Sequence, residues 1–261
     1  MTRVKLCGMM RPEDIQAVNE IKPEYIGFVF AKKSRRYVSK EQAKMLKEML
    51  DPAVKAVGVF VNEPVENVAD LLNEGIVDMA QLHGVEDEAY ICRLRELTGR
   101  GEDTFIIKAV QVKSEADVKA GEQSGADLVL FDAGAGDGKV FNWKLLENVK
   151  RPYFLAGGLD PENVRDAVER LRPFGVDVSS GIESFGVKDA LKMAKFVAAV
   201  RKGSGSNAFS VRNGLTYYLS LSTGFRHAPV RLHRTTSAAF GQLRSRCGQL
   251  TSKMTACVYK E

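Results

Sequence analysis

Two residues far apart in the chain have side chains that could move protons, Cys7 and Asp132. A thiol acts as a base once it has lost its proton, and a carboxylic acid can protonate a leaving oxygen. Each residue closes a short apolar run, VKLC and LVLFD. Taken alone, Cys7 is typical of a small buried hydrophobe and Asp132 of a helix cap or loop residue. Acid–base catalysis therefore depends on whether the fold brings the two together.

Apolar runs rich in β-branched or aromatic residues recur along about 200 residues, with helical patterns between them. Strands that alternate with helices are typical of βαβ units and a parallel sheet. Eight such units favour a closed (β/α)8 TIM barrel, of class α/β, and the first turn, CGMMRPED, lacks the GxGxxG of a dinucleotide fold. The expected strands are Val4–Cys7, Tyr25–Phe30, Val54–Val61, Val77–His83, Thr104–Val110, Leu128–Asp132, Tyr153–Ala156 and Val176–Ser179.

Local signals mark where helices begin and where the barrel ends. Ser39 with Gln42 predicts a capping box before a helix over Ala43–Leu50. The last helix is predicted over Asp189–Lys202, followed by Gly and a GSGSN linker. We therefore place the barrel domain at residues 1–202.

In barrels of this kind the active site lies at the C-terminal ends of the strands and is formed by the βα loops. Cys7 ends the first expected strand and Asp132 the sixth, so this rule brings the base and the acid to one mouth. Gln81 and His83 end the fourth strand, and Asp177 lies in the eighth. We expect these three to bind the substrate there.

The loops after strands seven and eight predict a phosphate site. They read AGGLDPENV and DVSSGIE, and barrels often hold phosphate with these two loops and a short helix N-terminus. Gly157 and Gly158 let backbone N–H groups approach an anion, and Ser180 and Gly181 offer the same from the other side. The alternative is that the glycines only allow tight turns.

Two tempting motifs are set aside. GAGDGKV at 134–140 is not a P-loop, because Ala133 and Val140 stand where Walker A needs Gly and Ser or Thr; we expect a mobile loop that covers the site. Lys108 could form a Schiff base, but a charge at the edge of a strand is the favoured interpretation. The scattered cysteines predict no metal site.

Charge divides the chain in two. The net charge of +5 conceals a body of about −2 and a segment of +7 from Ser204 onward, where eight Lys or Arg residues face one acid, Glu261. A negative body argues against nucleic acid as a partner of the barrel. No apolar run approaches the roughly 20 residues of a membrane helix, and no signal peptide is evident, so we expect a cytoplasmic protein without a membrane partner.

Together these segments resemble the phosphoribosylanthranilate isomerases of tryptophan biosynthesis. The resemblance covers residues 1–202 and is carried by stretches that come in the family's order, namely VKLCG, GFVFAKKSRRYVS, VGVFVNE, AQLHG, IIKAV, LFDAGAGDGKVFNW, AGGLDPENV and GVDVSSGIE. It implies an Amadori rearrangement of N-(5′-phosphoribosyl)anthranilate to 1-(2-carboxyphenylamino)-1-deoxyribulose 5-phosphate.

The resemblance also implies residue roles. Asp132 would protonate the furanose ring oxygen, and Cys7 would remove the C2′ proton of the resulting imine. Arg36 would pair with the anthranilate carboxylate, and Asp177 would lie near the anthranilate amine. Gly158 with Ser180 and Gly181 would hold the phosphate of this small-molecule substrate. No cofactor or metal is expected, because the imine is the electron sink, and the oligomer is expected to be a monomer or a homodimer.

Alternatives remain open at this point. Related sugar-phosphate isomerases of the histidine pathway use an aspartate base at the end of strand one, where this chain has Cys7. A protein that binds nucleic acid through its basic tail is the alternative from another class, although no motif supports it. The loop after Lys139 reads Val-Phe-Asn-Trp where the family often has Thr-Phe-Asp-Trp.

Residues 203–261 match nothing in this family. They form a basic segment almost without acids, with no sustained helical or strand period. We expect a disordered extension or a non-native one, such as a read-through or frameshift product.

Overall fold

The strands close into a barrel in the order of the sequence. The computed structural model describes residues 1–99, 101–132, 143–205, 210–212 and 215–217. Each barrel strand pairs in parallel with the next, and the first pairs with the eighth, which confirms the predicted (β/α)8 fold. The barrel strands are β1 (Arg3–Cys7), β2 (Tyr25–Val29), β3 (Lys55–Phe60), β4 (Met79–Leu82), β5 (Ile106–Gln111), β6 (Leu128–Asp132), β7 (Tyr153–Ala156) and β8 (Gly175–Val178).

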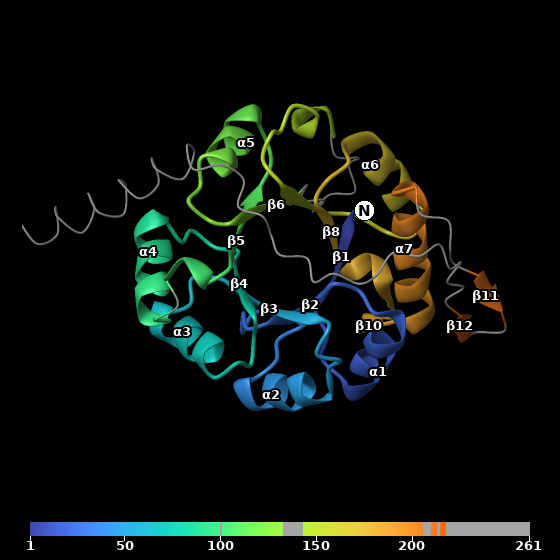
Figure 1. Ribbon diagram of the computed structural model, residues 1–261, viewed down its shortest axis with the longest axis horizontal. Coiled ribbons are helices and arrows are strands. Elements are labelled where there is room, and N and C mark those ends of the chain that lie inside the picture. Colours follow the sequence, from blue (N-terminus) through green and yellow to red (C-terminus); the bar gives the residue numbers. More distant parts are fainter. Residues whose placement is uncertain (100, 133–142, 206–209, 213–214, 218–261) are drawn as a thin grey trace, which may run out of the picture.

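Helices surround the strands as a ring (Figure 1). They are α1 (Pro12–Ile21), α2 (Lys40–Met49), α3 (Val65–Asn73), α4 (Glu88–Leu97), α5 (Glu115–Glu122), α6 (Val164–Leu171) and α7 (Ala190–Gly203). Short 3-10 turns occur at η1 (Gly101–Asp103), η2 (Trp143–Leu146) and η3 (Ser180–Ile182), and η2 lies between β6 and β7. The last helix ends one residue after the predicted boundary of the barrel.

Alternating side chains divide the core into two parts. Outward-facing residues of the strands pack against the helices and form the larger cluster, which contains Leu6, Phe28 and Phe131. Inward-facing residues fill the barrel and form a separate, smaller cluster, which contains Val57, Leu130 and Phe154 among others. Because successive side chains of a strand point to opposite faces, this alternation decides which strand-end residues face the mouth.

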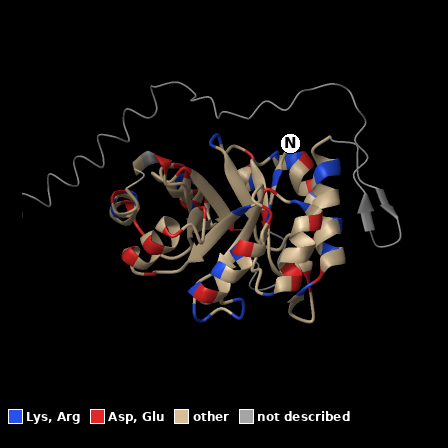
Figure 2. Ribbon diagram, turned by 60° about the horizontal axis from the view of Figure 1, so that its bottom comes forward, with Lys and Arg blue, Asp and Glu red and all other residues tan. Residues whose placement is uncertain are grey.

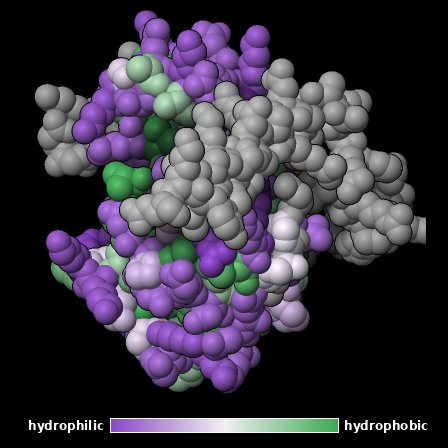
Figure 3. Space-filling view, turned by 90° about the vertical axis from the view of Figure 1, so that its left-hand side faces the viewer, coloured by the Kyte–Doolittle hydropathy of each residue, from purple (hydrophilic) through white to green (hydrophobic). Residues whose placement is uncertain are grey.

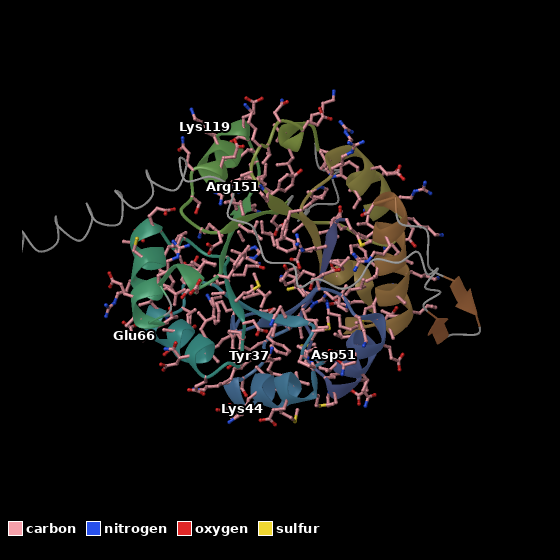
Figure 4. The ribbon with its side chains drawn as sticks, in the orientation of Figure 1. Tyr37, Lys44, Asp51, Glu66, Lys119 and Arg151 are labelled. Carbon is pink, nitrogen blue, oxygen red and sulfur yellow. The ribbon has the colours of Figure 1, made fainter. Side chains whose placement is uncertain are left out.

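Polar residues lie on the outside of this shell. Charged side chains occupy mainly the helices and loops (Figure 2), and the face in Figure 3 is mostly hydrophilic with small apolar groups between. Lys44, Glu66 and Lys119 lie on the outer side of α2, α3 and α5 (Figure 4). Among the described residues, no helix combines the length and apolar character needed to span a membrane.

One local prediction is only half right. Ser39 is the N-cap of α2, and its hydroxyl accepts a hydrogen bond from the Gln42 backbone N–H at 3.2 Å. The Gln42 side-chain amide, however, donates to the Met10 carbonyl at 2.7 Å. Tertiary contact with the loop after β1 therefore competes successfully with the return bond of the expected capping box.

The segment after α7 is described only in part. Two three-residue strands, β11 (Ser210–Arg212) and β12 (Leu215–Tyr217), pair in antiparallel fashion. The rest of the extension predicted at 203–261, and the covering loop predicted at 134–140, lie outside the described residues.

Candidate active site

A cavity of about 470 Å³ opens at the C-terminal ends of the barrel strands. All but one of the residues that we predicted for the site line it, although they come from six strands and their loops. Those lining it are Cys7, Arg36, Gln81, His83, Asp132, Gly157, Gly158, Asp177 and Ser180. Convergence of polar groups from several strand ends in one concave site is the usual form of a barrel active site.

Cys7 lies on the buried side of the cavity with 7% of its surface exposed. An added Cβ at Gly27, its partner on β2, would come within 2.6 Å of the Cys7 sulfur, so the glycine leaves room for the thiol. Burial raises the pKa of the thiol. Lys5 and Lys188 oppose this shift, whereas Asp177 adds to it. Burial therefore outweighs the two lysines, and the thiol holds its proton more strongly than a free cysteine does.

The acid side of the cavity contains a short polar chain. The Gln81 side-chain amide nitrogen is 2.9 Å from His83 Nδ1, and His83 Nε2 is 3.5 Å from Asp132 Oδ2. If the amide donates, Nδ1 is an acceptor and the ring proton sits on Nε2, facing the carboxylate. This arrangement orients Asp132 into the cavity.

Gln81 also brings an unpaired acceptor to the site. Its side chain is 1% exposed, and its Oε1 atom has no hydrogen-bond partner among the described residues. A buried acceptor without a partner costs free energy, and this one belongs to a residue that lines the cavity.

Arg36 reaches the cavity from the loop after β2. Its Nε and Nη2 atoms donate to the two carboxylate oxygens of Glu183, at 2.6 and 3.1 Å. Gly8, with a φ of +84°, lies so close to the Arg36 side chain that an added Cβ would be 2.5 Å from its Cδ atom. Glu183 thus binds one edge of the guanidinium, and the close packing of Gly8 against the Arg36 side chain helps to fix its orientation.

The hairpin after β8 supplies the groups that hold Arg36. Glu183 in β9 (Glu183–Ser184) also accepts from Lys188 in β10 (Val187–Lys188), at 2.8 Å, and from Arg35, at 2.6 Å. Burial acts to raise the pKa of Glu183, but Arg36 and Lys188 outweigh it and keep that pKa below its usual range. Lys188 in turn donates to the carbonyl of Ser179.

The loops after β7 and β8 present backbone donors. Gly157 and Gly158 have φ values of +90° and +65°, which favour glycine. The N–H groups of Gly158, Ser180 and Gly181 have no acceptor within the part of the chain that the structure describes. Asn163 braces the first loop by donating to the Gly158 carbonyl at 2.9 Å. Such a cluster of backbone donors suits an anion.

Gly181 is the exception among the predicted residues, since it does not line the cavity. An added Cβ there would meet the Leu159 carbonyl oxygen at 2.0 Å. Gly181 must lack a side chain because the loop after β8 packs here against the loop after β7. These two loops are called the phosphate loops below, after the ligand that the sequence predicts for them. Sequence reasoning placed Gly181 at the right loop, but could not see the loop packed against it.

Other residues of the site were missed by sequence reasoning. Ser179 and Gln111 line the cavity, while Lys5, Glu183 and Lys188 hold its polar groups from behind. The signal that could have found Lys5 is its place two residues before Cys7, on the same face of the strand. Lys108, by contrast, forms an ion pair with Glu86 at 3.0 Å. This pairing agrees with the interpretation of Lys108 as a charge at the edge of a strand.

Comparison with known proteins decides among the barrel isomerases. The profile of the N-(5′phosphoribosyl)anthranilate (PRA) isomerase family matches residues 4–199. The N-(5′-phosphoribosyl)anthranilate isomerase of Acetivibrio thermocellus is 46% identical over 215 residues, which cover 78% of this chain and 98% of that protein. The chain belongs to the PRA isomerase family.

Solved structures of the family show the same barrel. A PRA isomerase in complex with reduced 1-(o-carboxyphenylamino)-1-deoxyribulose 5-phosphate is 37% identical, with a TM-score of 0.69 over 77% of this chain and 100% of that one. Monomers of the dimeric enzyme from Thermotoga maritima are also 37% identical, with a TM-score of 0.68 over the same shares. The match ends where the barrel ends.

Proposed function

We propose that this chain isomerises N-(5′-phosphoribosyl)anthranilate with Asp132 as general acid and Cys7 as general base. The observation that supports these roles is that both side chains line one cavity together with the backbone donors of the two phosphate loops. A substrate held by its phosphate would place its ribose between the acid and the base. Family membership supplies the reaction, and the geometry supports the assignment of the residues.

The first step opens the sugar ring. Asp132 gives its proton to the furanose oxygen, the C1′–O bond breaks, and the lone pair of the anthranilate nitrogen forms the C1′=N imine. His83 faces the Asp132 carboxylate and keeps it directed toward the substrate. General acid catalysis of this kind typically contributes about 10²- to 10⁴-fold.

The second step moves a proton from C2′. The Cys7 thiolate takes that proton, the C–H electrons form a C1′=C2′ bond, and the nitrogen of the protonated imine receives the displaced pair and keeps its own hydrogen. The enolamine then tautomerises to the ketone. The iminium itself accepts the electrons, so this route calls for neither metal nor cofactor.

The polar groups around the reacting atoms would bind the rest of the substrate. Arg36 has its other guanidinium nitrogen, Nη1, available for the anthranilate carboxylate, because the edge formed by Nε and Nη2 is bound to Glu183. The unpaired Gln81 carbonyl would accept a hydrogen bond from a substrate hydroxyl or amine. Asp177 lies close enough to the base to interact with the amine.

The cell compartment, the oligomeric state and the partners of the chain are proposed as well. We propose that the chain works in the cytoplasm, as a monomer or a homodimer, on a small phosphorylated substrate without nucleic acid.

The test of the function is turnover by the full chain. Fluorescence of N-(5′-phosphoribosyl)anthranilate, freshly formed from anthranilate, is followed on addition of the protein. Loss of fluorescence with saturation kinetics, absent in a Cys7→Ala/Asp132→Asn double variant, is the expected result. If the folded protein gives no turnover, the proposal reduces to a phosphate-binding barrel.

A further inference from the structure

A lysine is completely buried inside the barrel, directly below the base. Lys5 is 0% exposed and has one of the largest fully buried side chains among the described residues. It pairs in register with Asp177 on the neighbouring strand β8, and its Nζ lies 2.9 Å from Asp177 Oδ1. Neighbouring inward positions belong to the apolar interior cluster, which includes Val57 and Phe154. A buried charge in such surroundings needs partners.

The second partner of Lys5 is Cys7. The two residues are i and i+2 on β1 and therefore point to the same face of the strand. The positive charge of Lys5 acts to lower the pKa of the buried Cys7 thiol, and the charges of Asp177 and of a Cys7 thiolate act to raise the pKa of Lys5. Although burial acts to lower the pKa of Lys5, these two partners outweigh it and the pKa is raised, so the lysine keeps its charge.

We propose that Lys5 is a positioning residue that stabilises the thiolate of Cys7, and that Asp177 limits this effect by sharing the ammonium. The inference rests on the proposed role of Cys7 as the base. Lys5 itself is not among the residues that line the cavity, so it acts through the two lining residues beside it, Cys7 and Asp177.

The other charged groups near the Cys7 sulfur are paired with other residues. Lys188, in the hairpin after β8, lowers the pKa of Cys7 at longer range, but its ammonium is bound to Glu183 and to Ser179. Across the mouth, Asp132 faces His83, and Arg36 is bound to Glu183. Lys5 is therefore the cation that shares a strand face with the thiol and lies outside the hairpin.

Charge balance explains why a pair, rather than a lysine alone, is found there. When Cys7 carries its proton, Lys5 and Asp177 neutralise each other, and the buried cluster costs little. When the thiolate forms, the ammonium can turn toward the sulfur while Asp177 keeps access to the cavity and to a substrate amine. The ion pair thus lets the base change charge without leaving an unpaired lysine.

The experiment measures the ionisation of Cys7 in the free protein, without turnover. Iodoacetamide is neutral and alkylates only the thiolate, forming an S–C bond with loss of iodide. Its rate at Cys7 is followed against pH by mass spectrometry of the Cys7 peptide. Lys5→Met keeps the length of the side chain and removes the charge. We expect the midpoint to rise by about 1 to 3 pH units, because an opposite charge at contact distance shifts a pKa by that amount.

Two further variants separate the effect of losing the Lys5 charge from a general loss of structure. Arg201→Met also removes a buried cation, but one bound to Glu24 and the Thr2 carbonyl at the other end of β1, and should leave the midpoint unchanged. Asp177→Asn should move the midpoint in the opposite direction, downward, and this test holds even if Lys5→Met fails to fold.

A folded Lys5→Met protein with an unchanged midpoint, or an Asp177→Asn midpoint that rises, would overturn the inference. Failure of the proposed function looks different: turnover is absent or survives Cys7→Ala, whereas the shifts in alkylation remain.

Discussion

At the scale of single residues, the two side chains proposed as acid and base have different surroundings. Cys7 is buried beside Lys5 and has a raised pKa, whereas Asp132 lies near the opening beside His83. Because burial raises the pKa of Cys7, the thiolate that the proposed mechanism needs depends on the cations near it. Two predictions belong to this scale.

The first concerns the two groups themselves. Cys7→Ala and Asp132→Asn should each lower kcat by about 10²- to 10⁴-fold, because each removes one proton-transfer group. Circular dichroism should show an intact fold, and Glu169→Gln, at an exposed pair with Arg165, serves as a control with full activity. A variant that keeps more than about a third of kcat would rule out the role assigned to its residue.

The second concerns pH. The active form needs a Cys7 thiolate together with a neutral acid, so kcat/KM should be bell-shaped. Since burial raises the pKa of Cys7, the base has the higher pKa and the alkaline limb reports its ionisation. Cys7→Ser should change that limb, because a serine hydroxyl does not ionise in this range. An active Cys7→Ser variant with the same profile would assign the titration to another group.

At the scale of elements, the loops after β7 and β8 carry the binding groups, and a hairpin behind them sets the position of Arg36. The phosphate loops offer backbone donors, whereas the hairpin β9–β10 offers a buried carboxylate shared by cations. Each element gives a prediction of its own.

The phosphate loops should bind inorganic phosphate in the absence of substrate. Phosphate should compete with substrate and raise Tm, because it binds only the folded loops. Gly158→Val should remove the protection, since Gly158 has a φ of +65° and a β-branched residue both strains the turn and blocks the anion. Sulfate serves as a parallel anion. Protection that persists in a folded Gly158→Val protein would place the anion elsewhere.

The hairpin should depend on the charge of Glu183. Glu183→Gln leaves Lys188 buried without its carboxylate, and breaking such a pair typically costs about 3 to 5 kcal/mol. Because folding lowers the pKa of Glu183, its contribution is present above the ordinary value of about 4.3 and is lost as pH falls through the lowered pKa. Urea unfolding should therefore show a large difference at pH 7 that shrinks in acid. KM should also rise, since Arg36 loses its anchor.

The matched control is again Glu169→Gln, whose exposed pair with Arg165 is screened by solvent and should change the free energy of unfolding little. If Glu183→Gln costs no more than this control at pH 7, the hairpin does not depend on the buried ion pairs.

At the scale of the whole molecule, the barrel is complete without the last part of the chain. β1 pairs with β8, α7 packs against α1 and α6, and the family match stops at residue 199. The described residues that line the cavity all lie between Cys7 and Ser180.

A stop codon after Lys202 should accordingly leave kcat/KM within about twofold, and protease should remove the extension from the full chain first, because exposed termini are cut before packed elements. Gel filtration and the fluorescence assay compare the two lengths. A truncated protein that is insoluble or inactive would show that the extension packs on the barrel. Salt-sensitive RNA binding by the full chain alone would instead favour the basic-arm interpretation.

The barrel strands, the residues at their ends and the family could all be predicted from the sequence by itself. The eight apolar runs predicted every barrel strand to within two residues, since period and length are properties of the local chain. The same pattern located Cys7, Asp132 and His83 at strand ends, and the rule that such ends share one face brought them to one mouth. The motifs then indicated the family that the comparisons show.

Only the tertiary structure decided which charged residues pair with one another. Lys5 meets Asp177 172 residues away because β1 closes on β8 in one particular register, and Arg36 meets Glu183 across 147 residues. Gln42 bonds to Met10 instead of completing its capping box, and Gly181 supports loop packing instead of lining the cavity. Local patterns specify which face a side chain takes, but partners distant in sequence depend on strand register and loop packing, which no local pattern contains.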